Sequence, residues 1–129
     1  MFTVQQIDEA HSKVKSGAEF PAYIQEIKTF GVKSFETFVS DGHTDYHGDQ
    51  DYRTSSDPLY APLVIAQHTN AEQFSKDLKN HQQGGTDFFT FCADCAKSGI
   101  EKWIVDLDKM TCIYYDQSGQ EILTEQIPS

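Results

Sequence analysis

The sequence predicts an α+β fold in which two helix–helix–hairpin units form one antiparallel sheet with the helices packed on one face. Three observations indicate it: an internal repeat, apolar spacing that changes from helical to alternating within each copy, and glycines where elements change. With 129 residues the chain can bury its own core, and we expect a single domain over 1–129. Two small units packed side by side are the alternative.

The repeat is the basis of this prediction. Residues 70–116 read as a diverged copy of residues 3–48, with 49–69 as the connection. The shared positions are mostly glycine, aromatic and aliphatic residues, which fix turns and cores, while polar positions differ. The matched pairs include Phe20 with Phe88, Ile24 with Cys92, Ile27 with Cys95, Gly31 with Gly99, Phe35 with Trp103 and Tyr46 with Tyr114.

Helices are expected first in each copy. Thr3 and Asn70 are suitable N-caps, because their side-chain oxygens can accept hydrogen bonds from the free amides of a first helical turn. Glycines at Gly17 and at Gly84-Gly85 are expected to end these first helices. Second helices are expected over 19–30 and 87–98, each followed by a glycine cap at Gly31 and Gly99.

Strand hairpins are expected to end each copy. Asp41-Gly42 predicts a two-residue type I′ turn, and Asp108-Lys109 takes its place in the second copy. The apolar run 63–66 predicts a further strand, near an edge of the sheet because prolines flank it. The hairpin strands are expected at 32–40 with 43–48 and at 100–107 with 110–115, and a last strand at 120–126.

A two-residue turn fixes the strand register, and alternation then divides the side chains between two faces. In this register Glu36 lies opposite His47, and Phe38 lies opposite Asp45. Phe35 and Trp103 belong to the face that the helices cover. The opposite face is expected to carry Phe38, Ile104, Ile113 and Tyr115 as an apolar strip, beside Glu36, His43, Asp45 and His47.

Such a strip on an open sheet face is typical of a contact surface. We therefore expect the binding residues at these positions, and a homodimer contact or a protein partner as the occupant. The alternative is that the connection 49–67 folds over the face, because connections of that length usually lie on something.

The polar residues of this face allow a different function. His43, Asp45 and His47 alternate along one strand with Glu36 opposite, and such groups could hold a divalent ion or act as general acid and base. Residues two apart on a flat strand are roughly 7 Å apart, which is wide for a shared small ion. A metal-dependent or acid–base enzyme is therefore the alternative to a binding module. Ordinary cross-strand pairs on a polar strand face explain the same pattern without any site. We assign no metal or cofactor.

Cys92 and Cys95 have the spacing of a redox or zinc pair. They replace Ile24 and Ile27 of the first copy, however, and those residues are expected to face inward. Buried thiols behave as small apolar groups. We expect buried cysteines at both positions, and a redox or metal role stays open.

Charge and hydropathy limit the partners. The chain carries a formal net charge of −10, which disfavours direct binding to nucleic acid or to an anionic membrane. No apolar run approaches the roughly 20 residues needed to cross a bilayer. The first residues lack a signal-peptide pattern and the cysteines are odd in number, so we expect a cytoplasmic protein. An acidic mimic of nucleic acid, which would occupy a basic partner, is a third interpretation.

Four segments resemble an uncharacterised bacterial family of about this length: 11–17 (HSKVKSG), 37–44 (TFVSDGHT), 91–103 (FCADCAKSGIEKW) and 110–112 (MTC). Members of that family occur in enterobacterial and other genomes, often within prophages, and some carry the label "phage envelope protein". The resemblance spans essentially the whole chain. It implies an α+β fold and no particular activity, cofactor or catalytic residue. Together, these observations predict a non-catalytic cytoplasmic binding module of prophage origin.

Overall fold

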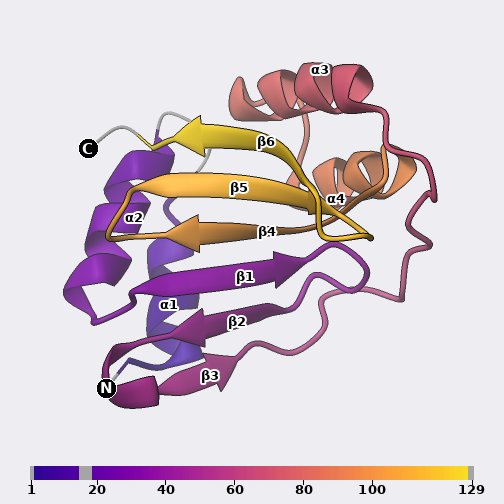
Figure 1. Cartoon of the computed structure of the whole chain (residues 1–129). Coiled ribbons are helices and arrows are strands. Elements are labelled where there is room, and N and C mark those ends of the chain that lie inside the picture. The colour runs from indigo at the N-terminus through magenta and orange to yellow at the C-terminus, as the bar shows by residue number, and fades with distance from the viewer. Residues whose placement is uncertain (1, 15–18, 128–129) are drawn as a thin grey trace.

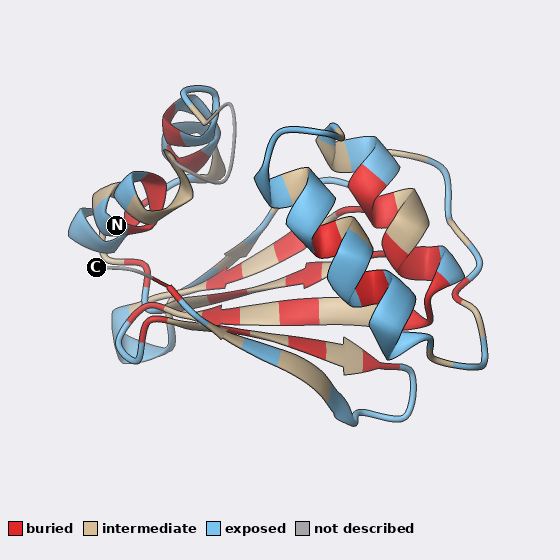
Figure 2. Cartoon of the chain, turned by 90° about the horizontal axis from the view of Figure 1, so that it is seen from above, coloured by how far each residue is buried: buried red, intermediate tan, exposed pale blue. Residues whose placement is uncertain are grey.

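A computed structural model describes residues 2–14 and 19–127 of the chain. Within these ranges, four α-helices pack on one face of a six-stranded antiparallel sheet, which confirms the predicted α+β fold. Figure 2 shows both helix pairs on the same side of the sheet, and no described helix on the other side. None of the described helices is long and apolar enough to cross a membrane.

The first half of the chain forms two helices and three strands. Thr3 and Gln6 make a capping box, in which the Thr3 hydroxyl oxygen accepts from the Gln6 amide at 3.2 Å and the Gln6 side chain accepts from the Thr3 amide at 2.9 Å. The first helix ends at His11, before the predicted end at Gly17, which lies outside the described residues. The elements are α1 (Val4–His11), α2 (Phe20–Thr29), β1 (Ser34–Phe38), β2 (Thr44–His47), the short 3₁₀ helix η2 (Asp49–Asp51) and β3 (Arg53–Ser55).

The second half has the same order of two helices and three strands. Asn70 caps the first of these helices by accepting from the Gln73 amide at 3.0 Å. Gly31 and Gly99, which follow the second helix of each half, have φ angles of +105° and +82°, as expected for left-handed caps. The elements are α3 (Ala71–Gln82), α4 (Phe88–Lys97), β4 (Ile100–Asp106), β5 (Thr111–Asp116) and β6 (Glu121–Gln126).

The strand order is β3-β2-β1-β4-β5-β6, so each half supplies three neighbouring strands and the halves meet where β1 pairs with β4 (Figure 1). Burial alternates along β1, β2 and β5, as expected for a sheet that helices cover on one face. Phe35 and Trp103 lie on the covered face, with 5% and 8% of their surface exposed. The two halves therefore share one inside and one outside.

The predicted register of the first hairpin is wrong by two residues. Backbone hydrogen bonds place the loop between Phe38 and His43, and the glycine of the expected two-residue turn closes this longer loop with a φ of +79°. Glu36 therefore pairs with Asp45, and the predicted pairs Glu36–His47 and Phe38–Asp45 do not form. A shift of two residues leaves every side chain on its face, because strand side chains alternate with period two. The predicted division into faces is thus unaffected.

The predicted strand at 63–66 is also wrong, because β3 supplies the third strand of the first half. The segment instead lies beside the first hairpin loop and α4. The Leu63 amide donates to the Ser40 carbonyl at 2.7 Å, and the Ala66 amide donates to the Ala96 carbonyl at 2.8 Å. Prolines in the connection cannot donate to a strand neighbour. The connection therefore passes the end of the sheet and the helices, and does not cross the opposite sheet face (Figure 1).

Candidate binding surface on the outer sheet face

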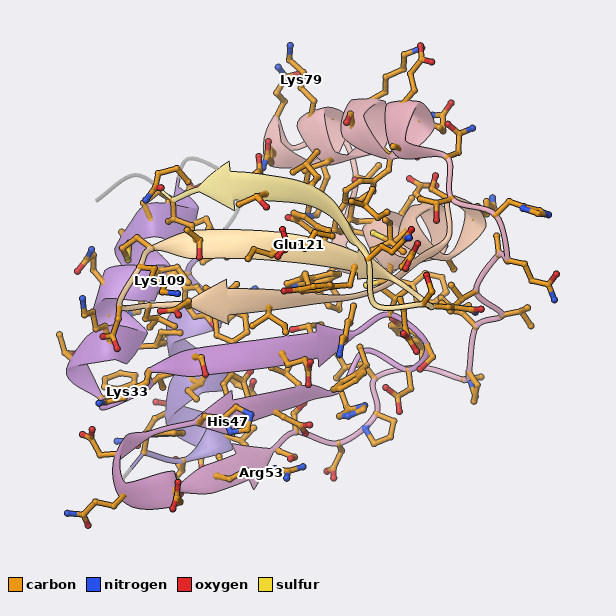
Figure 3. The ribbon with its side chains drawn as sticks, in the orientation of Figure 1. Lys33, His47, Arg53, Lys79, Lys109 and Glu121 are labelled. Atoms are coloured by element: carbon orange, nitrogen blue, oxygen red, sulfur yellow. The ribbon has the colours of Figure 1, made fainter. Side chains whose placement is uncertain are left out.

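Every second side chain of the strands points away from the helices, and these side chains form what we call the outer face. Figure 3 views this face, with His47, Arg53 and Glu121 labelled. Strand pairing arranges the central side chains in three rows across the sheet. The residues of these rows on β1, β2, β4 and β5 are partly exposed, since their neighbours on the sheet shield them in part.

Aromatic side chains and one lysine form the first row. The His43 ring stacks on Phe38, with centroids 4.5 Å apart and planes 9° apart. Phe38 pairs with Lys102, which pairs in turn with Tyr115. The Lys102 ammonium lies 5.9 Å from the Phe38 ring centre and 5.8 Å from the Tyr115 ring centre, within the range of a cation–π contact.

Carboxylates and isoleucines form the second row. Asp45 pairs with Glu36, Glu36 pairs with Ile104, and Ile104 pairs with Ile113. The Glu36 carboxylate also receives the Lys102 ammonium from the first row, at 2.9 Å. The four predicted anchors, which are Phe38, Ile104, Ile113 and Tyr115, therefore lie in two adjacent rows that an ion pair connects.

His43 is held by two carboxylates at the end of the first row. Its Nδ1 lies 2.5 Å from the Asp41 carboxylate, which also accepts from the His43 backbone amide at 3.0 Å. Its Nε2 lies 3.7 Å from Asp45. Partial burial by itself raises the pKa of Asp41, but the hydrogen bonds from His43 outweigh this and bring the pKa below its usual value.

The predicted polar cluster is only partly assembled. His43 and Asp45 are close, and Asp45 pairs with Glu36, but Glu36 is occupied by Lys102. The third row runs through Ser34, Asp106 and Thr111. His47 lies in this row, where it is opposite Arg53 on β3. Within residues 2–14 and 19–127, no group of three or more His, Cys, Asp or Glu side chains is placed to hold a metal ion.

Sequence reasoning missed two residues of this surface. Lys102 lies two positions before Ile104, so the period-two alternation of β4 already places it on the outer face. Asp41 was assigned only to a turn. An aspartate side chain commonly accepts a hydrogen bond from the backbone amide two residues later, and Asp41 accepts from the His43 amide in this way. Lys102 joins the first two rows, and Asp41 orients His43.

The cysteines lie in the core, away from the outer face. Cys92, Cys95 and Cys112 are free and buried, as the match of the first two with Ile24 and Ile27 predicts. Burial raises the pKa of Cys92 to about 11 and that of Cys112 to about 12, and it raises the pKa of Cys95 as well. Their thiols therefore stay protonated at neutral pH.

Two hollows lie elsewhere on the protein. The larger, of about 330 Å³, is lined by Phe2, Phe30, Gly31, Asp49, Gln50 and Tyr52. The smaller, of about 150 Å³, lies between α1 and α2 and includes Ala10 and Tyr23. Neither includes a residue of the three rows, so the outer face presents its side chains on a sheet surface and not in these hollows.

A protein-family model described as "Protein of unknown function (DUF1398)" matches residues 8–126. The match covers most of the chain, and the chain belongs to this family. No curated protein matches the sequence.

Proposed function

We propose that this member of the DUF1398 family is a non-catalytic binding module whose outer face contacts a protein partner. The observation that supports the proposal is the apolar strip of Phe38, Ile104, Ile113 and Tyr115, on a sheet face that no described helix covers (Figure 2). Apolar side chains gathered on an open surface among charged ones are typical of interaction sites. These four residues are the expected anchors of the contact.

The polar side chains of the outer face favour binding over catalysis. Glu36 forms an ion pair with Lys102, and Asp45 accepts a hydrogen bond from Ser55 at 2.6 Å, so both carboxylates already have partners within the protein. Catalytic groups usually converge on a concave site that excludes water, whereas these rows lie side by side on a sheet. A contact surface therefore fits the arrangement better than a catalytic centre.

A metal-dependent or acid–base enzyme is the second candidate, and one observation favours its acid–base form. Asp41 contacts His43 through Nδ1, while Nε2 faces Asp45 at 3.7 Å, beyond hydrogen-bond distance, and can transfer a proton as in a general base that a carboxylate orients. Elemental analysis of the purified protein and thermal melting with Zn²⁺, Mn²⁺ or Mg²⁺ test the metal-dependent form. Bound metal, or a rise in Tm that His43→Asn abolishes, would support the metal-dependent form. The absence of both effects would contradict it.

We also propose an origin and a compartment for the protein. A gene duplication is supported by the common order of elements in the two halves, and by equivalent positions such as Ile27 and Cys95, which are both fully buried. A cytoplasmic location is supported by three free cysteines, because reduced thiols are typical of that compartment. A bacterial, prophage-associated origin is supported by the resemblance of the four segments given above.

Site-specific photo-crosslinking tests the contact surface. A benzophenone amino acid replaces either Tyr115 on the outer face or Phe89 on α4, which is 51% exposed on the helical side and serves as the control. In extracts of the source organism we expect a discrete crosslinked product from position 115 alone, and we expect Ile113→Glu to abolish it. Equal products from both positions, or a product that persists with Ile113→Glu, would contradict the proposal.

A further inference from the structure

The size of the outer face limits what can cover it. The six strands are spaced about 4.8 Å apart and are three to seven residues long, which gives a surface of about 25 Å by about 17 Å. A partner that covered it would bury roughly 850 Å² in total, which is close to the lower limit of about 1,000 Å² for a specific protein contact. A face of this size suits a reversible contact better than an obligate dimer, which usually buries at least twice that area.

The charge of the outer face disfavours a second copy of the chain as the occupant. Lys102 and Arg53 are already neutralised there, at 2.9 Å from Glu36 and 3.6 Å from Asp45. The exposed Glu121 adds negative charge on β6, and the whole chain carries −10. Two faces of the same sign repel when they approach, whereas a basic surface is attracted.

One edge of the apolar strip combines an aromatic ring with a carboxylate. Tyr115 and Glu121 are opposite each other on β5 and β6. On β4, the other strand that pairs with β5, the Lys102 ammonium lies 5.8 Å from the centre of the Tyr115 ring, and its carboxylate partner is Glu36. The face thus already holds one cation between rings and a carboxylate, and Tyr115 with Glu121 offers the same chemistry to a cation from outside.

Resting on the proposed function of this face, we propose that its partner is a basic protein segment, extended in shape, in which Lys or Arg and an aliphatic or aromatic residue stand two positions apart on the same side of the segment. The apolar side chains of the segment lie on Ile104 and Ile113. Its cations meet Tyr115 and Glu121 at the edge of the strip. In an extended segment the side chains at every second position point the same way, so a cationic and an apolar side chain two residues apart both face the sheet.

Fluorescence anisotropy with labelled synthetic peptides tests the proposal on the full chain. The probes are three peptides of about a dozen residues that repeat Lys-Ser-Leu-Ser, Glu-Ser-Leu-Ser or Lys-Ser-Ser-Ser, and we call them the Lys–Leu, Glu–Leu and Lys–Ser peptides. We expect the Lys–Leu peptide to bind at least roughly tenfold more tightly than the other two, because it alone combines both chemistries. Its affinity should fall as salt rises.

Two outer-face variants and one control locate the binding. Glu121→Lys should weaken the Lys–Leu peptide at least roughly fivefold, while Glu72→Lys on α3, an equal charge change at a side chain that is 84% exposed, should weaken it less than about twofold. Equal effects of these two variants would overturn the proposal, since they would show attraction to overall acidity. Ile113→Ser, which keeps the charge, should also weaken binding, provided that its thermal melting shows a folded protein.

The remaining outcomes separate this proposal from the proposed function. If Ile113→Ser weakens the Lys–Leu and Glu–Leu peptides equally from similar affinities, the outer face binds proteins but has no preference for a basic partner. If Ile113→Ser changes nothing while Glu121→Lys matches its control, the outer face is not the binding surface and both proposals fail. A dimer mass in light scattering, reduced to a monomer by Ile113→Glu, would identify a second copy as the occupant and overturn the basic partner.

Discussion

The ion pair between Lys102 and Glu36 gives a direct test of how the outer face is organised. Its nitrogen and oxygen are 2.9 Å apart, and the two side chains are 28% and 21% exposed. Fully exposed pairs contribute about 0.2–1 kcal/mol. This pair is better shielded from water, and the two rings beside the ammonium do not enter its coupling, because Lys102→Met removes their contacts whether or not Glu36 is present. After the entropy of fixing two long side chains, we expect a coupling free energy of about 1 kcal/mol.

A double-mutant cycle measures this coupling. Lys102→Met, Glu36→Gln and the double variant are compared with the wild type by urea unfolding, at low and at high salt. The control cycle uses Lys76→Met and Glu72→Gln on α3, where the atoms are 3.8 Å apart and the side chains are 69% and 84% exposed. We expect at most about 0.5 kcal/mol there. If the outer-face pair shows no more coupling than the control, the two side chains do not form the contact described above.

Three other predictions concern the fold, the thiols and acid stability. Gly99→Ala should lower Tm clearly more than Gly119→Ala, although the two φ angles are similar, at +82° and +83°. A Cβ at Gly99 would lie 2.8 Å from the His68 carbonyl oxygen, whereas a Cβ at Gly119 would meet nothing within 4 Å. Equal losses of Tm would contradict this prediction. Burial raises the pKa of all three thiols, so a disulfide reagent at pH 8 should label the cysteines only after unfolding, and rapid labelling of the native protein would refute it. The pKa of Asp41 is lowered in the folded protein, so its carboxylate stabilises the fold above the ordinary aspartate pKa of about 3.9, and this stabilisation is lost as pH falls. Asp41→Asn should therefore flatten the acid side of a plot of unfolding free energy against pH. An unchanged plot would argue against the His43 contact.

The fold could be predicted from the sequence where local chemistry and the repeat agreed. Thr3 and Asn70 cap helices as their side chains predict, and Gly31 and Gly99 take left-handed conformations after the second helix of each half. The strip side chains also lie on one face. Strand alternation is a period-two property, so it survived the error of two residues in the first hairpin.

The errors have two physical causes, which are a competing local contact in the first hairpin loop and, elsewhere, contacts between residues distant in sequence. An Asp41-Gly42 pair is suited to a two-residue turn, but the aspartate instead accepts from the His43 amide and ring, and the loop is longer. The apolar segment 63–66 resembles a strand in composition, yet its amides bond to Ser40 and Ala96. Ion pairs such as Lys102 with Glu36 depend on which strands are neighbours, and the pairing of β1 with β4 is not encoded locally.

That junction has a consequence for how the chain reaches its native state. Among the described strands, every pairing except that of β1 with β4 lies within one half of the chain. Each three-stranded portion can therefore assemble from strands that are near in sequence. Joining the portions closes the longest loop and carries the largest entropic penalty, so it should come last during folding. A single proteolytic cut in the connection before α3 would leave two fragments in which β1 and β4 become newly exposed strand edges if they separate, and these two edges would draw the fragments back together.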